Sequence, residues 1–333
     1  MLLGEKIKVQ QMMRSDATDE ELLLYKQMGI RYAYVYFNDY DSNYEDMKRF
    51  QEKLKNYGIE ITDACNAGYY KNPSIHLGLK DRDICIDRYI DFTKNLAKLG
   101  IKLGYMTWDS DVYETKHDVG KYSRGSKTRI VEEADIPVHD LKFGRHYDEK
   151  EIWENCEYFL KKVMPVLKEY NMKIAFHPDD PPVPCFHDVC NLIWRSDDYR
   201  RLFALVNDDP HIVMKFCVGC WLQGGAQFGN LMEDLEEFVK KGKVAVVHFR
   251  NVSGTLPYFE ETLIEDGYMD MYRILRRLIE LDYDGVITID HPLEMVEKFG
   301  GKRIGNAYMV GYLKGMLDAA IKDVNNVNIK ENS

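Results

Sequence analysis

The sequence predicts a (β/α)8 barrel, the TIM-barrel fold. Three observations lead to this prediction: eight short apolar segments typical of buried strands, amphipathic stretches between them, and glycines at several helix ends. Eight is the number at which a parallel sheet alternating with helices closes into a barrel. A doubly wound open sheet is the alternative, but the GxGxxG fingerprint after the first strand is missing.

The eight predicted strands are short runs rich in Val, Ile, Phe and Tyr. They comprise Ile7 to Gln11, Tyr32 to Phe37, Glu60 to Ala64, Lys102 to Thr107, Lys173 to His177, Ile212 to Cys217, Val244 to His248 and Val286 to Asp290.

The segments between these strands place apolar residues at positions i, i+3, i+4 and i+7, which predicts amphipathic helices. They comprise Glu20 to Met28, Tyr44 to Asn56, Asp83 to Leu99, Glu151 to Tyr170, Leu231 to Lys240, Met269 to Leu281 and Asn306 to Ala320. Gly29, Gly58 and Gly100 suit the left-handed position after a helix, and each is followed at once by an Ile and then by the next strand. The recurring unit is therefore helix, glycine, buried strand.

We predict one domain over residues 1–333, with long insertions at about residues 108–148 and 178–197. Both are longer than the usual connection of about 2 to 6 residues between strand and helix. Long loops after barrel strands are where active sites are elaborated, so the insertions are expected to shape the site.

Composition excludes several classes of protein. The net charge of −10 without a Lys/Arg block argues against nucleic acid as a partner. No run of 18 apolar residues could span a bilayer, and the N-terminus lacks a signal-peptide pattern, so we expect a cytoplasmic protein that does not bind membranes. The seven cysteines form no repeated CxxC pair, which favours free thiols. The oligomeric state is left open, with a homo-oligomer as one alternative.

The last four predicted strands end in residue types that bind metals. His177, Cys217, His248 and Asp290 follow apolar residues at spacings of about one strand–helix unit, so their side chains are expected to meet at the carboxyl end of the barrel. Such a set can hold one divalent cation. A lone His or Cys at a strand end is more often a packed residue, but four in succession favour a metal site. Cys220 is the alternative thiol, in the loop beyond the strand.

Other candidates surround this ring. Arg250 could pair with a substrate carboxylate, or simply neutralise nearby acids. His291 could act as a general base or be a structural histidine. Asp179 and its neighbour Asp180 could orient His177, contact substrate or cap the loop. Tyr308, near the start of the last helix, is a candidate acid.

These motifs together resemble the mannonate dehydratase family, a metal-dependent branch of the xylose isomerase-like barrels. The resemblance is carried by HPDDPP after a strand, a Cys at the next strand end, HFRN, a strand ending in Asp-His, and an early HLGLKDRD stretch. It extends over most of the chain. Two departures are Pro292 after His291, where the family has Gly, and the segment TWDSDVYETKHDVGKY, which does not match.

The resemblance implies a hydro-lyase that converts D-mannonate to 2-keto-3-deoxy-D-gluconate in glucuronate catabolism. It also implies Mn²⁺ or Fe²⁺ at His177, Cys217, His248 and Asp290, although a thiolate ligand by itself favours Zn²⁺ or Fe²⁺. In the mechanism we expect, the metal and Arg250 stabilise an enediolate, His291 removes a proton, and Tyr308 protonates the leaving hydroxyl. Substrate contacts are expected at Trp108, Asp179 and Arg250.

Two other functions stay open at this point. A metal-dependent isomerase or epimerase of a neutral sugar would tolerate replacement of Arg250, because no substrate carboxylate needs a partner. A non-catalytic sugar-binding or metal-storage protein would show no activity that a chelator abolishes and a defined metal restores.

Overall fold

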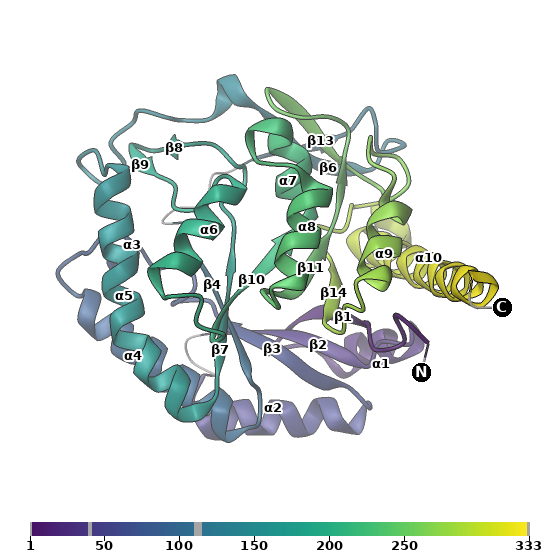
Figure 1. The fold of residues 1–333 in the computed structure, drawn as a ribbon, viewed down its shortest axis with the longest axis horizontal. Coiled ribbons are helices and arrows are strands. Elements are labelled where there is room, and N and C mark those ends of the chain that lie inside the picture. Colours follow the sequence, from purple (N-terminus) through teal and green to yellow (C-terminus); the bar gives the residue numbers. More distant parts are fainter. Residues whose placement is uncertain (1, 39–41, 110–114, 332–333) are drawn as a thin grey trace. The chain divides into compact units, whose positions relative to one another are not determined.

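A computed structural model describes residues 2–38, 42–109 and 115–331 of the chain. Eight parallel strands follow in the order β1-β14-β11-β10-β7-β4-β3-β2 and close a barrel, which confirms the predicted fold class (Figure 1). The barrel strands are β1 (Lys8–Arg14), β2 (Tyr32–Phe37), β3 (Glu60–Asn66), β4 (Leu103–Thr107), β7 (Lys173–His177), β10 (Ile212–Cys217), β11 (Val244–Phe249) and β14 (Val286–Ile289).

Helices occupy the segments that the periodicity predicted, within one or two residues at most ends. They are α1 (Asp19–Gln27), α2 (Tyr44–Asn56), α4 (Arg82–Lys98), α5 (Glu149–Tyr170), α8 (Leu231–Lys240), α9 (Met271–Glu280) and α10 (Gly301–Glu331). The sequence did not predict α3 (Pro73–His76), α6 (Ser196–Leu205) and α7 (Val218–Gly224). The helix α10 is longer than expected at both ends.

The chain divides into two compact units. Unit 1 comprises Met1–Val9, Glu114–Asp135 and Phe216–Ser333, and unit 2 comprises Gln10–Tyr113 and Ile136–Lys215. The strands β1 and β10 each belong to both units, because the boundaries fall inside them. The prediction of a single domain over residues 1–333 stays a prediction.

In unit 2, glycine ends three helices as predicted. Gly29, Gly58 and Gly100 have φ values of 73°, 73° and 78°, the left-handed conformation that other residues adopt at a cost. The following Ile donates its backbone N–H to a carbonyl inside the helix, as in Ile30 to Tyr25 at 3.0 Å. This pattern terminates the helix and directs an apolar residue into the next strand.

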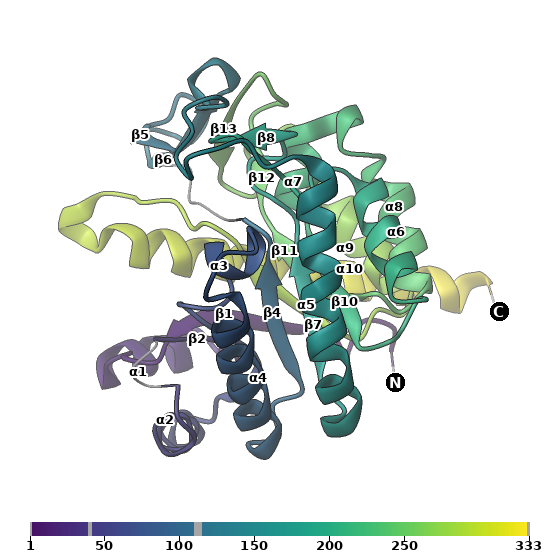
Figure 2. The same cartoon turned by 90° about the vertical axis from the view of Figure 1, so that its left-hand side faces the viewer.

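In unit 1, the first insertion forms part of an antiparallel sheet. The strands β5 (Lys116–Val119) and β6 (Lys127–Glu132) join β13 (Tyr258–Thr262) and β12 (Asn251–Val252) in the order β12-β13-β6-β5 (Figure 2). Phe259 faces Val131 and Glu260 faces Ile130 in the register of β13 with β6. Residues 110–114 of the insertion lie outside the described residues. They are part of the segment TWDSDVYETKHDVGKY, which does not match the family.

The second insertion lies in unit 2 and contains a small hairpin, β8 (Cys185–Phe186) and β9 (Val189–Cys190), before α6 begins. Asp179 closes the base of this segment: its backbone N–H donates to the carbonyl of Ile193, and its carboxylate accepts the N–H of Ile193, both at 2.7 Å.

None of the described helices combines the length and apolarity needed to cross a bilayer.

The interior of unit 2 holds a charged pair that the sequence did not reveal. Lys215 on β10 and Asp63 on β3 are both fully buried, with Nζ 3.0 Å from Oδ2. The ammonium group also lies 3.6 Å and 3.9 Å from the ring centroids of Tyr34 and Tyr105. The two rings and the carboxylate thus replace the water that a buried lysine would lose.

Candidate functional site

Three of the four predicted metal ligands lie in unit 1, at or next to strand ends. Cys217 is the last residue of β10, His248 is the penultimate residue of β11, and Asp290 directly follows β14. The Sγ of Cys217 lies 3.7 Å from Oδ2 of Asp290, and Nδ1 of His248 lies 3.5 Å from Oδ1 of Asp290. Ligand atoms of Cys217 and His248 lie within 4.8 Å of each other. These side chains are therefore grouped as the spacing predicted.

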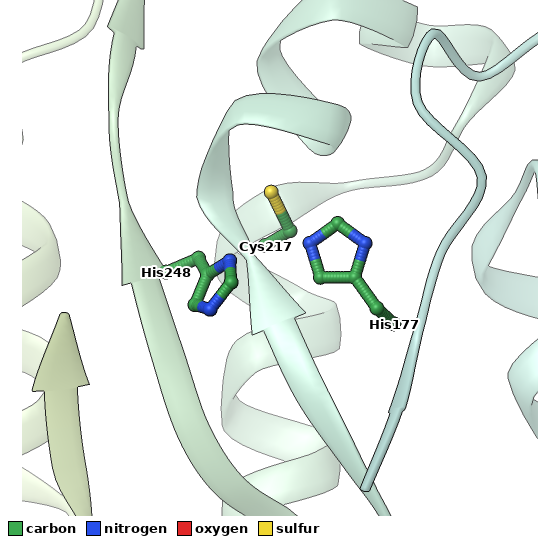
Figure 3. Close-up of side chains that lie close together, drawn as sticks. All are labelled: His177, Cys217 and His248. Atoms are coloured by element: carbon green, nitrogen blue, oxygen red, sulfur yellow. The ribbon is translucent and has the colours of Figure 1, made fainter. Parts of the chain in front are cut away.

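Figure 3 shows Cys217 and His248 leaving neighbouring strands side by side. Cys217 is fully buried and His248 is 7% exposed. The alternative thiol, Cys220, lies in α7 beyond the strand and is fully buried there. This arrangement favours Cys217 over Cys220 as the ligand, as expected from the continuation of the strand.

The fourth predicted ligand, His177, ends β7 in unit 2. In unit 2, β7 pairs in parallel with β10, with Phe176 opposite Met214. The Nδ1 of His177 lies 2.7 Å from the carbonyl oxygen of Pro178, so Nδ1 carries the hydrogen and Nε2 is left as the ligand atom.

Arg250 is fully buried against this group in unit 1. Its Nε lies 3.3 Å from Oδ2 of Asp290, its Nη2 lies 3.5 Å from Sγ of Cys217, and its Nη1 forms an ion pair with Glu261. A Cβ at Gly219 would lie 2.2 Å from Nε of Arg250, so the guanidinium needs a glycine there. In this structure Arg250 pairs with protein carboxylates, the alternative role that the sequence left open.

Glu261 is the residue that the sequence analysis missed. It is 2% exposed on β13, and its Oε1 accepts a hydrogen bond of 2.8 Å from Nδ1 of His291 and lies 3.4 Å from Nη1 of Arg129. Burial raises the pKa of Glu261, but His291 and Arg250 outweigh burial and lower it to about 2. The available signal was two adjacent acids in the apolar run YFEETLI, ten and eleven residues after Arg250.

His291 is held in place through Nδ1 by Glu261 and Arg250. Nδ1 of His291 lies 2.8 Å from Oε1 of Glu261, which accepts, and 2.7 Å from Nη1 of Arg250, which donates. Nε2 faces the other way and lies 3.5 Å from Oδ1 of Asp290. Desolvation lowers the pKa of His291, but the carboxylates of Asp290 and Glu261 prevail and raise it. Its side chain is 44% exposed, so it can exchange protons with solvent.

The backbone of His291 is strained. Its φ is 47°, in the left-handed region that residues other than glycine rarely adopt. Such a conformation costs on the order of 1–3 kcal/mol and is found preferentially at functional sites. Pro292, which follows, also restricts His291. The conformation directs the imidazole to Glu261.

Tyr308 lies on α10 in unit 1 and is 37% exposed. Its hydroxyl donates to Glu265, and Nη1 of Arg124 lies 3.4 Å from the hydroxyl oxygen. Arg124 also pairs with Glu265 at 2.9 Å and with Asp266 at 2.7 Å. The hydrogen bond to Glu265 raises the pKa of Tyr308, which keeps the hydroxyl protonated.

The predicted substrate contacts Trp108 and Asp179 are buried in unit 2, at 2% and 1% exposure. Trp108 stacks on His76 with ring centroids 4.5 Å apart, and its Nε1 has no hydrogen-bond partner within the described residues. Burial, together with Asp109, raises the pKa of Asp179. Asp179 thus caps its loop as described, one of the roles the sequence allowed.

The donor set fits a divalent transition metal. Thiolate, imidazole and carboxylate donors are the ligands that Zn²⁺ and Fe²⁺ accept together, and a thiolate is softer than Mn²⁺ usually selects. Nearby Arg250 offsets the negative charge that a thiolate and two carboxylates bring into a buried place. The residues present in unit 1 alone thus supply three donors of different kinds.

Comparisons with known proteins agree on one family. The family model described as D-mannonate dehydratase (UxuA) matches residues 132–327, more than half of the chain. A mannonate dehydratase of Lactococcus lactis subsp. cremoris (strain MG1363) is 27% identical over 318 residues, which cover 84% of this chain and 87% of that protein. A mannonate dehydratase of Brachyspira hyodysenteriae is 26% identical over the same length and coverage.

Solved structures show the same fold. The crystal structure of mannonate dehydratase from Streptococcus suis serotype 2 matches with a TM-score of 0.83 at 21% identity, covering 95% of this chain and 94% of that chain. A 3-keto-D-glucoside 4-epimerase from E. coli matches with a TM-score of 0.61 at 13% identity, covering 91% and 98%. Both likenesses concern the barrel and its connections.

Proposed function

Because the chain belongs to the D-mannonate dehydratase (UxuA) family, a family of hydro-lyases, we propose that it removes water from D-mannonate to give 2-keto-3-deoxy-D-gluconate. The observation that carries the proposal is the group formed by Cys217, His248 and Asp290 with Arg250 packed against it. The family match supports the substrate, and this group supports the metal-dependent chemistry.

We propose that His177, Cys217, His248 and Asp290 hold the divalent cation. When bound, the metal supplies a Lewis acid that stabilises negative charge on substrate oxygens. The family resemblance favours Mn²⁺ or Fe²⁺, and the thiolate of Cys217 favours Fe²⁺ or Zn²⁺. Fe²⁺ satisfies both arguments.

His291 is the proposed base. Nδ1 is engaged by Glu261 and Arg250, which leaves Nε2 to remove the proton from the carbon beside the substrate carboxylate. The Glu261 carboxylate then stabilises the imidazolium that forms, whereas the positive charge of Arg250 lowers the pKa of His291. We also propose that Arg250 contacts the substrate carboxylate directly. Its guanidinium would then be shared between the substrate and Glu261.

Tyr308 is the proposed acid, since the raised pKa keeps a proton on its hydroxyl for transfer to the leaving group. Trp108 and Asp179 stay proposed substrate contacts. We further propose that the reaction serves glucuronate catabolism in the cytoplasm, with a small sugar acid as the partner of the site. A homo-oligomer is also a proposal.

The test is to strip the protein with a chelator, add Mn²⁺, Fe²⁺ or Zn²⁺ without oxygen, and follow the 2-keto-3-deoxy product from D-mannonate. We expect metal-dependent product, none with His177→Ala, and strongly reduced product with Arg250→Ala. The exposed residues His117 and Arg49 provide matched controls, His117→Ala and Arg49→Ala, which should retain activity.

Two outcomes would contradict the proposal. If metal binds but mannonate is unchanged while a neutral sugar is isomerised, the chain is an epimerase or isomerase, and Arg250→Ala should then be tolerated. If no metal changes any activity, the chain is a binding protein. The structural likeness to an epimerase makes the neutral-sugar assay the natural second substrate screen.

A further inference from the structure

Two cysteines in unit 2 face each other across a tight hairpin. Cys185 on β8 pairs with Cys190 on β9, and Phe186 pairs with Val189 next to the turn. The turn residues His187 and Asp188 have φ values of 51° and 57°, as the two central residues of a type I′ turn require. This turn fixes which residues oppose each other.

The register puts the cysteines at the position where cross-strand disulfides fit. The backbone N–H of Asn191 donates to the carbonyl of Pro184 at 2.8 Å, so the next pair toward the turn, Cys185 with Cys190, is a non-hydrogen-bonded pair. Cα atoms in such pairs are about 4.5 Å apart, within the range of about 4.4–6.8 Å that a disulfide spans. The two sulfur atoms lie 2.8 Å apart.

These are also the accessible thiols of the chain. Cys185 and Cys190 are half-buried, whereas Cys65, Cys85 and the three remaining cysteines are buried. The hydrogen bond from Cys185 lowers the pKa of Cys190. Either sulfur can donate the hydrogen bond between them, so each thiol can support the other as a thiolate.

We propose that Cys185 and Cys190 are a reversible oxidation site that forms an intramolecular disulfide with hydroperoxides. The thiolate of Cys190 attacks one oxygen of H₂O₂, which yields a sulfenic acid on Cys190 and, after protonation of the departing hydroxide, water. The sulfur of Cys185 then attacks the sulfenic sulfur, so that the S–S bond forms and a second water leaves. Overall, two thiols give up two hydrogens and two electrons, and H₂O₂ is reduced to two waters.

The disulfide would close a segment that is already tied at its base. Asp179 joins Ile193 by two hydrogen bonds, and the hairpin lies between these residues. Since the segment directly follows His177, oxidation would add a covalent closure to the loop beside a proposed metal ligand. The oxidation site itself stands without the proposed activity, because it rests on the hairpin geometry.

The sequence allows a clean readout. Trypsin cleaves after Lys173 and Arg195 and nowhere between, so one peptide, residues 174–195, contains Cys185 and Cys190 and no other cysteine. The reduced full-length protein is treated with equimolar H₂O₂, blocked with iodoacetamide, unfolded and digested. We expect this peptide to lose two hydrogens and to take no iodoacetamide label. Its oxidation should be at least about tenfold faster than oxidation of the buried Cys156. Dithiothreitol should restore two labelled thiols.

Variants make the test specific. With Cys190→Ser, the peptide should lose no hydrogens, and Cys185 should stay open to labelling after dithiothreitol treatment; Cys156→Ser should oxidise as the parent does. Thermal unfolding of each variant, followed by circular dichroism, shows that the fold is kept. The proposal is overturned if peptide 174–195 takes two labels after oxidation, or if its cysteines link different molecules. Neither result depends on dehydratase activity.

Discussion

The Nε of Arg250 lies 3.3 Å from Oδ2 of Asp290, and the same guanidinium lies 3.5 Å from Sγ of Cys217. One fully buried arginine thus contacts two of the proposed metal ligands, and it also contacts His291 and Glu261, the latter on a strand of the antiparallel sheet. Side chains in such positions orient metal ligands. Replacing one typically lowers the affinity for the metal about 10- to 100-fold. Arg250 therefore connects the barrel strand ends with β13 of the antiparallel sheet.

Replacing Arg250 by Lys should weaken metal binding about 10- to 100-fold, because an ammonium group cannot contact Asp290, Cys217 and Glu261 at once. The measurement is the metal dissociation constant by competition with a chelator. Arg49→Lys, at an exposed position, is the control. Unchanged affinity in Arg250→Lys would show that the guanidinium does not position the ligands.

Gly219→Ala should disturb the same arginine from the opposite side. The added Cβ would lie 2.2 Å from Nε of Arg250, in a place where both residues are buried. We expect a loss of about 1–3 kcal/mol in the free energy of unfolding, together with weaker metal binding. Gly311→Ala on α10, which meets nothing within 4 Å, should be neutral or slightly stabilising. Urea unfolding of both variants compares the two; equal stabilities would mean that the guanidinium can move away at no cost.

Glu261→Gln should cost about 3–5 kcal/mol at pH 7, because it removes the buried carboxylate charge that Arg250 and Arg129 share. The pKa of Glu261 is about 2 in the folded protein, below the ordinary value of 4.5. The stability it contributes is therefore complete above pH 4.5 and is lost as the pH falls through 2. Urea unfolding at several pH values should show the gap between parent and variant narrowing below pH 4.5. A gap independent of pH would contradict this.

His76 should make the free energy of unfolding depend on pH already above pH 4.5, where the contribution of Glu261 is still complete. It is fully buried, neither ring nitrogen has a hydrogen-bond partner within the described residues, and burial lowers its pKa from 6.5 to about 3. Protonation therefore favours the unfolded chain, and stability is lost as the pH falls from 6.5 toward 3, by about 1.4 kcal/mol per pH unit. His76→Phe keeps the ring stack on Trp108 and should remove this slope in urea unfolding. His117→Phe, at an exposed position, should leave the slope unchanged.

The buried pair of Lys215 and Asp63 should behave as one unit. Lys215→Met or Asp63→Asn alone leaves one group of the pair without its partner, which we expect to cost about 3–5 kcal/mol. The double variant should cost clearly less than the two single variants together. A double-mutant cycle of urea unfolding measures the difference, and additive costs would show that the two charges do not stabilise each other.

Local signals predicted the barrel well. The eight barrel strands and the glycine-ended helices depend on periodicity and on the conformational freedom of glycine, which act within a few residues. The identity of the strand-end residues was also predicted, because a parallel barrel brings all carboxyl ends of its strands to one rim. Two parts escaped this reasoning: the short helices such as α7, and the strands β5 and β6 inside the expected loop.

The sequence by itself thus determined the alternation of strands and helices and the residues Cys217, His248 and Asp290 at their ends. Only the tertiary structure decided that Arg250 pairs with Glu261, and that both contact Nδ1 of His291. It also decided that Cys185 meets Cys190, since their turn lacks the usual Asn-Gly signal. The physical reason is that periodicity and capping are local, whereas the partner of a buried charge or thiol is set by the three-dimensional packing of side chains.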